Sequence, residues 1–159
     1  MKIEGLPKNK DAHRKVAERM MDDLAVFSNW PNASDKTPLI DDLTSALDGA
    51  GRPYDGYDIA KNLDDFYWNI SADMVSELDF ADRFVEEELT KLISAWVEET
   101  GYKHPYAVGD NVAYNWGGKK ATGTIHEIRM NGNVLINLPE GNGCAVVSWE
   151  SVEPITTTA

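Results

Sequence analysis

Apolar residues recur at three- and four-residue intervals from the N-terminal end of the chain to about residue 100, which is the spacing of helices with one buried face. The spacing predicts one helix over residues 11–27 and a second over residues 37–48. The second begins at Thr37-Pro38, and proline suits the first helical turn because its missing N–H has no partner there. A third helix is predicted from a set of apolar positions, Ile59, Leu63, Phe66, Tyr67 and Ile70.

Two further helices are predicted before residue 101. Ser71 is of the type that caps a short helical turn, and residues 80–100 form the most regular helical pattern of the chain. Gly101 follows at the position where glycine ends helices. Glu88 falls inside the apolar arc of this last helix, so we expect its carboxylate to pair within the fold. Residues 8–101 are therefore predicted to form an all-α domain.

The pattern changes after His104-Pro105, where short apolar runs alternate with glycine-containing turns. These runs predict five strands, at residues 111–116, 121–129, 133–138, 144–149 and 152–155. Asn131-Gly132 predicts a tight hairpin, because both residue types tolerate positive φ. Five strands in about 50 residues are typical of a small barrel.

The same segment resembles a known family. The opening of Tudor-type and KOW-type SH3-like domains is similar to residues 108–114 (VGDNVAY), followed by Gly118 and by residues 121–125 (ATGTI). The last turn and final strand of such barrels are similar to residues 147–155 (VSWESVEPI). The resemblance implies a five-stranded SH3-like barrel over residues 106–155. The expected fold class is thus α+β, with an acidic all-α domain followed by a small barrel.

Charge is distributed unevenly along the chain. The whole protein has 27 acidic and 15 basic residues, a net charge of −12, and residues 35–99 have 17 acidic residues against five basic ones. This middle segment alone therefore accounts for the entire imbalance. A strongly anionic surface repels phosphate, which makes direct nucleic-acid binding the less favoured function and a protein with a basic surface the natural partner.

The acidic domain supplies the first set of candidate binding residues. Trp68 is predicted to lie opposite the apolar stripe of the third helix, next to Asp64 and Asp65, where an exposed tryptophan among carboxylates suits an interface anchor. Burial of Trp68 by the same domain is the alternative. Glu86 and Glu87 extend the acidic face. Carboxylates spaced along rigid helices can imitate a phosphate array, so one form of the expected function is a nucleic-acid mimic that inhibits or regulates a nucleic-acid-binding protein.

The barrel supplies a second set. Tyr114, Trp116 and Trp149 are the aromatic residues nearest the strand ends where Tudor-like domains build a cage for a cation, as the resemblance implies. Core packing of these rings is the alternative. Three cations, Lys119, Lys120 and Arg129, suit the phosphate contacts of KOW-like barrels. The competing hypothesis is therefore a reader of a peptide or RNA, with the helices used for docking or dimerisation.

Catalytic and cofactor chemistry find no support in the sequence. The three histidines, His13, His104 and His126, have no Glu or Cys at metal-ligand spacing, and we interpret them as surface residues. The single cysteine, Cys144, begins a predicted strand and has the pattern of a packed thiol. We expect a non-catalytic protein without cofactor or metal. The absence of a long apolar run or signal-peptide pattern predicts a cytoplasmic protein. Both a monomer and a homo-oligomer are compatible with the sequence.

Overall fold

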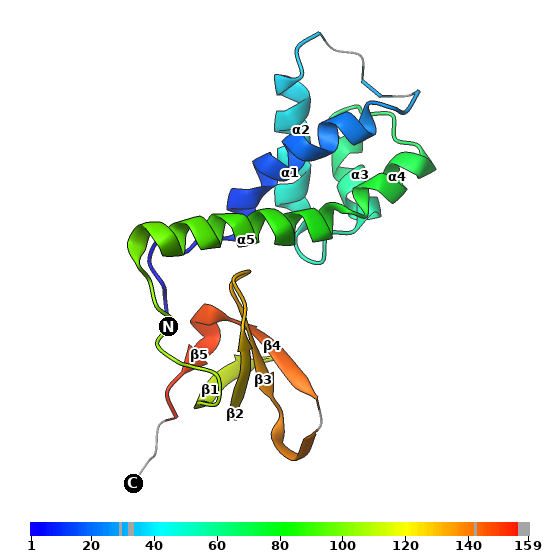
Figure 1. Cartoon of the computed structure of the whole chain (residues 1–159). Helices are drawn as coiled ribbons and strands as arrows, with labels where there is room; N and C mark the ends of the chain where they lie inside the picture. The colour runs from blue at the N-terminus through cyan, green and yellow to red at the C-terminus, as the bar shows by residue number, and fades with distance from the viewer. Residues whose placement is uncertain (29, 32–33, 142, 156–159) are drawn as a thin grey trace. The chain divides into compact units, whose positions relative to one another are not determined.

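The computed structural model describes residues 1–28, 30–31, 34–141 and 143–155. These residues form five helices followed by a five-stranded antiparallel sheet, so the predicted α+β class is confirmed (Figure 1). The chain divides into two compact units, one of Pro7–Lys91 and one of Met1–Leu6 with Leu92–Ala159. The sequence placed this boundary after residue 101, whereas the division falls inside the last helix.

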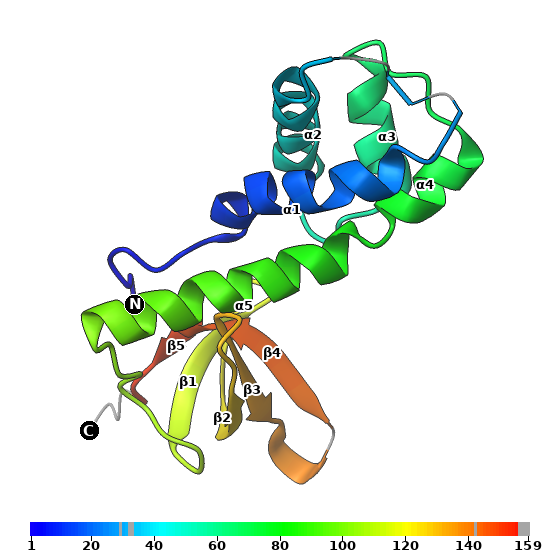
Figure 2. The same cartoon turned by 45° about the horizontal axis from the view of Figure 1, so that its top comes forward.

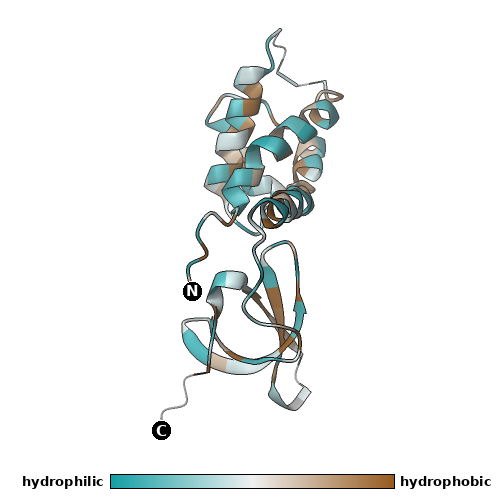
Figure 3. Ribbon diagram, turned by 60° about the vertical axis from the view of Figure 1, so that its left-hand side comes forward, coloured by the Kyte–Doolittle hydropathy of each residue, from teal (hydrophilic) through white to brown (hydrophobic). Residues whose placement is uncertain are grey.

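The helical unit is built from α1 (Asn9–Leu24), α2 (Thr37–Ala50), α3 (Gly56–Asp64), α4 (Ala72–Leu78) and the first turns of α5 (Ala81–Thr100). Along the chain α1 packs on α2, α2 on α3 and α3 on α4 (Figure 2). Hydrophilic and hydrophobic residues alternate along these helices (Figure 3), as expected for helices with one buried side. The largest fully buried side chains of this unit are Met20, Leu24, Leu43, Leu47, Ile59, Leu63, Met74 and Leu78.

Side chains and glycine define the helix ends. The Asp55 carboxylate accepts a hydrogen bond from the backbone N–H of Tyr57 at 2.7 Å and caps α3. The Ser71 hydroxyl accepts from the N–H of Met74 at 3.2 Å, which confirms Ser71 as the cap of α4. Gly101 follows α5 with φ of 67°, a backbone conformation that glycine adopts without strain.

Helix α3 is shorter than the sequence predicted, because it ends at Asp64. The prediction extended the helix to Ile70 and therefore placed Phe66 and Tyr67 on its buried stripe. The structure instead exposes 41% of Phe66 and 97% of Tyr67. Once the chain leaves the helix at Asp64, the three- and four-residue spacing no longer directs side chains toward the core.

The second unit contains β1 (Asn111–Trp116), β2 (Lys119–Ile128), β3 (Asn133–Asn137), β4 (Cys144–Ser148) and β5 (Val152–Glu153). The strands form one sheet in the order β4-β3-β2-β1-β5, with antiparallel pairing throughout. A register shift between Ile125 and Glu127 interrupts the β2–β3 ladder. No β4–β5 pairing occurs among the described residues, so the sheet is not closed.

The hairpin predicted at Asn131-Gly132 is present between β2 and β3, with the N–H of Arg129 donating to the carbonyl oxygen of Asn133 at 2.8 Å. Of the two turn residues, only Gly132 has positive φ, at 84°. A single left-handed glycine is typical of a three-residue loop rather than of the two-residue turn that the sequence suggested. The two-residue type lies instead between β1 and β2, where Gly117 and Gly118 both have positive φ.

Candidate functional site

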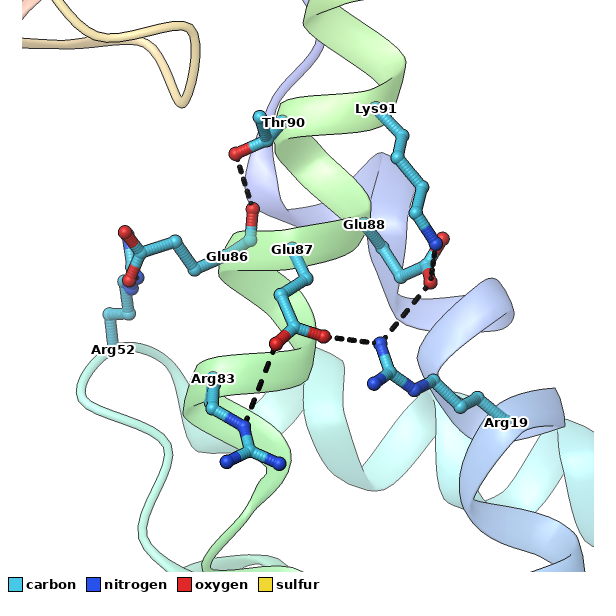
Figure 4. Close-up of polar contacts among 8 residues, drawn as sticks. All are labelled: Arg19, Arg52, Arg83, Glu86, Glu87, Glu88, Thr90 and Lys91. Atoms are coloured by element: carbon cyan, nitrogen blue, oxygen red, sulfur yellow. Dashed lines mark hydrogen bonds and ion pairs between the residues drawn. The ribbon is translucent and has the colours of Figure 1, made fainter.

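The acidic residues predicted on α5 are held by cations of the same unit (Figure 4). Arg19 of α1 approaches Glu87 with its Nη1 2.6 Å from Oε2, and Arg83 reaches the other carboxylate oxygen at 3.6 Å. The hydrogen bond from Arg19 holds the pKa of Glu87 below its usual range. Arg52 places its Nη2 3.7 Å from Oε2 of Glu86.

Glu88 completes this network. Its Oε1 lies 3.0 Å from Nζ of Lys91 and 3.5 Å from Nη1 of Arg19, so the predicted pairing of Glu88 within the fold is confirmed. The network thus sets four carboxylates against four cations, namely Asp82, Glu86, Glu87 and Glu88 against Arg19, Arg52, Arg83 and Lys91. Local charge on these turns of α5 is balanced, which leaves little negative potential there for a basic partner.

Trp68 does not occupy the exposed position that a role as interface anchor requires. Its side chain is 4% exposed, and its indole N–H donates to Oδ2 of Asp42 at 3.1 Å. The ring also packs edge-on against Trp30, with centroids 5.3 Å apart. The hypothesis that Trp68 is an exposed interface anchor is therefore wrong, and the alternative, burial of Trp68 within its own unit, is confirmed. The chain reverses after α3, which turns Trp68 inward instead of leaving it on a helix surface.

Asp64 and Asp65 differ from the paired carboxylates of α5, because both are exposed and neither side chain has an ion-pair or hydrogen-bond partner among the described residues. They belong to segment 55–79, which contains seven acidic residues and a single cation, Lys61. Two of the seven act within the fold: Asp55 caps α3, and Asp79 accepts from the N–H of Gly56 at 2.8 Å. Unpaired negative charge is therefore concentrated on α3 and α4.

A pocket of about 430 Å³ lies beside these carboxylates. This volume is within the range of small-molecule and side-chain binding pockets. Helix α3 and the residues that follow it supply the lining, which comprises Tyr57, Ala60, Lys61, Asn62, Asp64, Asp65, Ile70 and Val75. The pocket thus combines an aromatic ring, aliphatic side chains and two carboxylates.

Exposed aromatic residues lie in the same segment of the chain, and one of them, Tyr57, lines the pocket. Tyr57 is 63% exposed, and Phe66 and Tyr67 follow Asp65 directly in the chain. Large aromatic side chains exposed next to unpaired carboxylates are characteristic of interaction surfaces, because they provide contact area while the charges provide orientation. We call Tyr57, Asp64, Asp65, Phe66 and Tyr67 the α3–α4 surface.

Tyr67 has an unusual backbone. Its φ is 65°, and it is the one non-glycine residue with positive φ in the described part of the chain. The N–H of Tyr67 donates to the carbonyl oxygen of Asp64 at 2.9 Å, and that of Trp68 donates to Leu63 at 3.2 Å. This pair of bonds forms a Schellman motif, whose left-handed position is usually occupied by glycine. A bulky side chain there costs free energy and, at 97% exposure, gains no burial in return.

Replacing Tyr67 by glycine is therefore expected to stabilise the helical unit by about 1 kcal/mol, because glycine adopts the left-handed conformation without strain. Thermal unfolding followed by circular dichroism measures this effect. A Tyr67→Gly variant that melts at a lower temperature would contradict the backbone strain assigned to Tyr67.

The second set of predicted site residues is dispersed in the strand-containing unit. Tyr114 is 1% exposed and Trp149 is 2% exposed, so these rings pack in the core and cannot form the walls of an open cage. The hypothesis that Tyr114 and Trp149 form a cation cage is therefore wrong, and the alternative, packing of both rings in the core, is correct. Tyr102 stacks on Trp149, with centroids 5.9 Å apart, and His104 meets the same ring edge-on.

Two of the three cations in the predicted set are paired with acids. Lys120 lies 3.2 Å from Oε2 of Glu153, and the Nε of Arg129 lies 3.1 Å from Oε2 of Glu127. Trp116, which is 57% exposed, and Lys119 sit opposite each other at the Gly-Gly turn. Of the six predicted residues, these two are therefore the ones that the structure brings together on an accessible surface.

His13 is buried, at 3% exposure, and the interpretation of this residue as a surface histidine was wrong. Its Nδ1 lies 2.5 Å from Oδ1 of Asp48, and its Nε2 lies 2.5 Å from the hydroxyl of Tyr54. A carboxylate only accepts hydrogen bonds, so in the neutral ring Nδ1 donates to Asp48 and Nε2 accepts from Tyr54. Burial raises the pKa of Tyr54, which keeps its hydroxyl protonated. The contact joins α1, α2 and the loop after α2.

Among the described residues, no group of three or more His, Cys, Asp or Glu side chains is arranged to hold a metal ion. Cys144 is exposed rather than packed, and its Sγ lies 3.2 Å from Oδ1 of Asn137. None of the helices in the described part of the chain has both the length and the apolar character that a membrane crossing requires.

Comparison of the chain with protein-family models, with curated proteins and with solved structures finds no match. Tyr57, Phe66 and Tyr67 were not among the predicted site residues. Phe66 and Tyr67 fit the apolar spacing of the predicted third helix, and Tyr57 lies before the first residue of that stripe. The one available signal was the absence of a helix-ending glycine near residue 67, where an aromatic residue stands instead.

Proposed function

We propose that this protein is a non-catalytic binding protein whose acidic helical unit engages a basic protein surface through the α3–α4 surface. The observation that carries the proposal is that Asp64 and Asp65 are exposed without cationic partners among the described residues, whereas the carboxylates on the first turns of α5 are neutralised within the unit. Carboxylates that are not engaged internally remain available to lysine and arginine side chains of a partner.

Exposed rings of the α3–α4 surface support the same function. Tyrosine and phenylalanine attract lysine and arginine through their ring faces. They also provide apolar contact area, whose contribution to binding is not screened by salt. A surface that combines aromatic rings with carboxylates therefore suits a basic partner better than a hydrophobic or anionic one. Nucleic-acid mimicry is one form of this function, in which the partner is a protein that otherwise binds phosphates.

The proposal is tested by titrating the protein with a fluorescently labelled peptide rich in arginine and lysine, at low and at physiological salt. Affinity is expected to fall steeply as salt rises, because charge attraction is screened over about 8 Å at physiological ionic strength. An acidic peptide of the same length serves as the control and is expected not to bind. Equal affinity for both peptides would contradict the proposal.

A second candidate function rests on the resemblance of residues 106–155 to Tudor-type and KOW-type SH3-like barrels. The exposed Trp116 beside Lys119 favours it, because an aromatic ring next to a cation can stack on a base and contact a phosphate. In that case Trp116→Ala removes binding of single-stranded RNA, while changes at Asp64 and Asp65 have no effect. Because the other cations of the set are paired with acids, we rank this function second.

A further inference from the structure

The pocket beside α3 contains a cation–aromatic contact of its own. Lys61 and Tyr57 both line it, and Nζ of Lys61 lies 5.7 Å from the centroid of the Tyr57 ring. This separation is within the range of cation–π attraction. The 63% exposed ring of Tyr57 is therefore accessible to a cation from outside as well as to the lysine of its own helix.

Among the residues that the structure describes, Lys61 is the one cation that lines this pocket, and it forms no ion pair with Asp64 or Asp65. The two carboxylates thus line a partly apolar pocket without an ion-pair partner among the described residues. The apolar part comes from Ala60, Ile70 and Val75. A ligand that fits must place a cationic head near the carboxylates and the ring, and an apolar stem along the aliphatic side chains.

We propose that this pocket receives an arginine side chain of the basic partner, an inference that rests on the proposed function and narrows it to one residue type. The planar guanidinium group stacks on an aromatic ring and donates several hydrogen bonds to carboxylates at the same time. A lysine ammonium is a compact and strongly hydrated charge that does neither as well. The pocket volume of about 430 Å³ accommodates one long side chain.

In this arrangement Lys61 competes with the incoming arginine for the face of Tyr57 and repels its charge. Removing that lysine is therefore expected to strengthen binding, although most surface substitutions near a binding site weaken it. This opposite sign distinguishes an arginine pocket from a site for an anionic ligand, which would use Lys61 as a contact.

The test compares three peptides of equal length that alternate glycine with arginine, with lysine or with citrulline, the last being an uncharged isostere of arginine. Titration of the full chain is expected to give at least about fivefold tighter binding of the arginine peptide than of the lysine peptide, and no measurable binding of the citrulline peptide. Lys61→Met, which keeps the helix propensity and most of the length of the side chain, is expected to raise affinity for the arginine peptide about threefold. Tyr57→Leu is expected to remove the preference for arginine over lysine.

The outcomes separate this inference from the proposed function. Equal binding of the arginine and lysine peptides, with both dependent on Asp64 and Asp65, would overturn the arginine pocket and leave the proposed function standing. Unchanged or lower affinity in Lys61→Met would also overturn it. Absence of binding by both cationic peptides would overturn the proposed function itself. Circular dichroism of each variant confirms the fold before titration.

Discussion

Replacing Asp64 and Asp65 together by asparagine is expected to lower affinity for the arginine-rich peptide by about tenfold to a hundredfold. Hydrogen bonds to a charged group contribute about 1.5–3 kcal/mol when they are shielded from water, and each 1.4 kcal/mol is a factor of ten. Asparagine keeps the size of the side chain and removes the charge. Neither carboxylate has a partner within the described part of the unit, so the fold is expected to survive.

Glu98 and Glu99 provide a charge-matched control, because they form another adjacent and exposed pair of carboxylates near the end of α5. Changing both to glutamine alters the net charge of the chain by the same amount. If net charge alone attracts the peptide, the two double variants weaken binding equally. If the α3–α4 surface binds it, the control retains its affinity. Equal loss in both variants would contradict the proposed site.

The double variant Glu86→Gln with Glu87→Gln separates the two parts of the acidic domain. These carboxylates are paired with Arg52, Arg83 and Arg19, so their removal is expected to reduce stability rather than to abolish peptide binding. A large loss of affinity with normal stability would place the binding site on α5. It would contradict the conclusion that the paired carboxylates of α5 are not available to a partner.

Trp68→Ala is expected to destabilise the helical unit by about 3–5 kcal/mol, the usual cost of deleting a large buried aromatic side chain. The change removes the hydrogen bond to Asp42 and the edge-on packing with Trp30, and it leaves a cavity next to both. Chemical denaturation followed by far-ultraviolet circular dichroism measures the effect. Peptide affinity is to be measured below the transition, where the protein remains folded.

Trp116→Ala is the matched control, since this tryptophan is 57% exposed and its loss is expected to change stability by less than about 0.5 kcal/mol. Trp68→Phe keeps most of the ring volume and replaces the alanine variant in this test if that variant does not fold. It is expected to lower the free energy of unfolding by about 1–2 kcal/mol through the lost hydrogen bond. A Trp68 variant of normal stability that no longer binds the peptide would restore this residue as the interface anchor.

Local patterns in the sequence determined most of the secondary structure. Helical periodicity predicted the helices, and Ser71 and Gly101 predicted ends that the structure contains. Alternating short runs with intervening glycines predicted the strands. These features depend on neighbours in the chain, whose hydrogen bonds and rotamers favour one backbone conformation regardless of distant contacts. The excess of acidic residues in segment 35–99 is likewise a property of the sequence.

Tertiary structure alone decided which of these residues are accessible. Glu87 and Asp64 look equivalent in the sequence, but Arg19 of a distant helix pairs with the first, and no described cation pairs with the second. Trp68 and Tyr67 are adjacent, yet one is buried and the other fully exposed, because the chain turns between them in a left-handed conformation. Pairing and burial depend on the distances between residues that are far apart in the chain. These distances are set by how the helices pack, and local sequence patterns do not specify them.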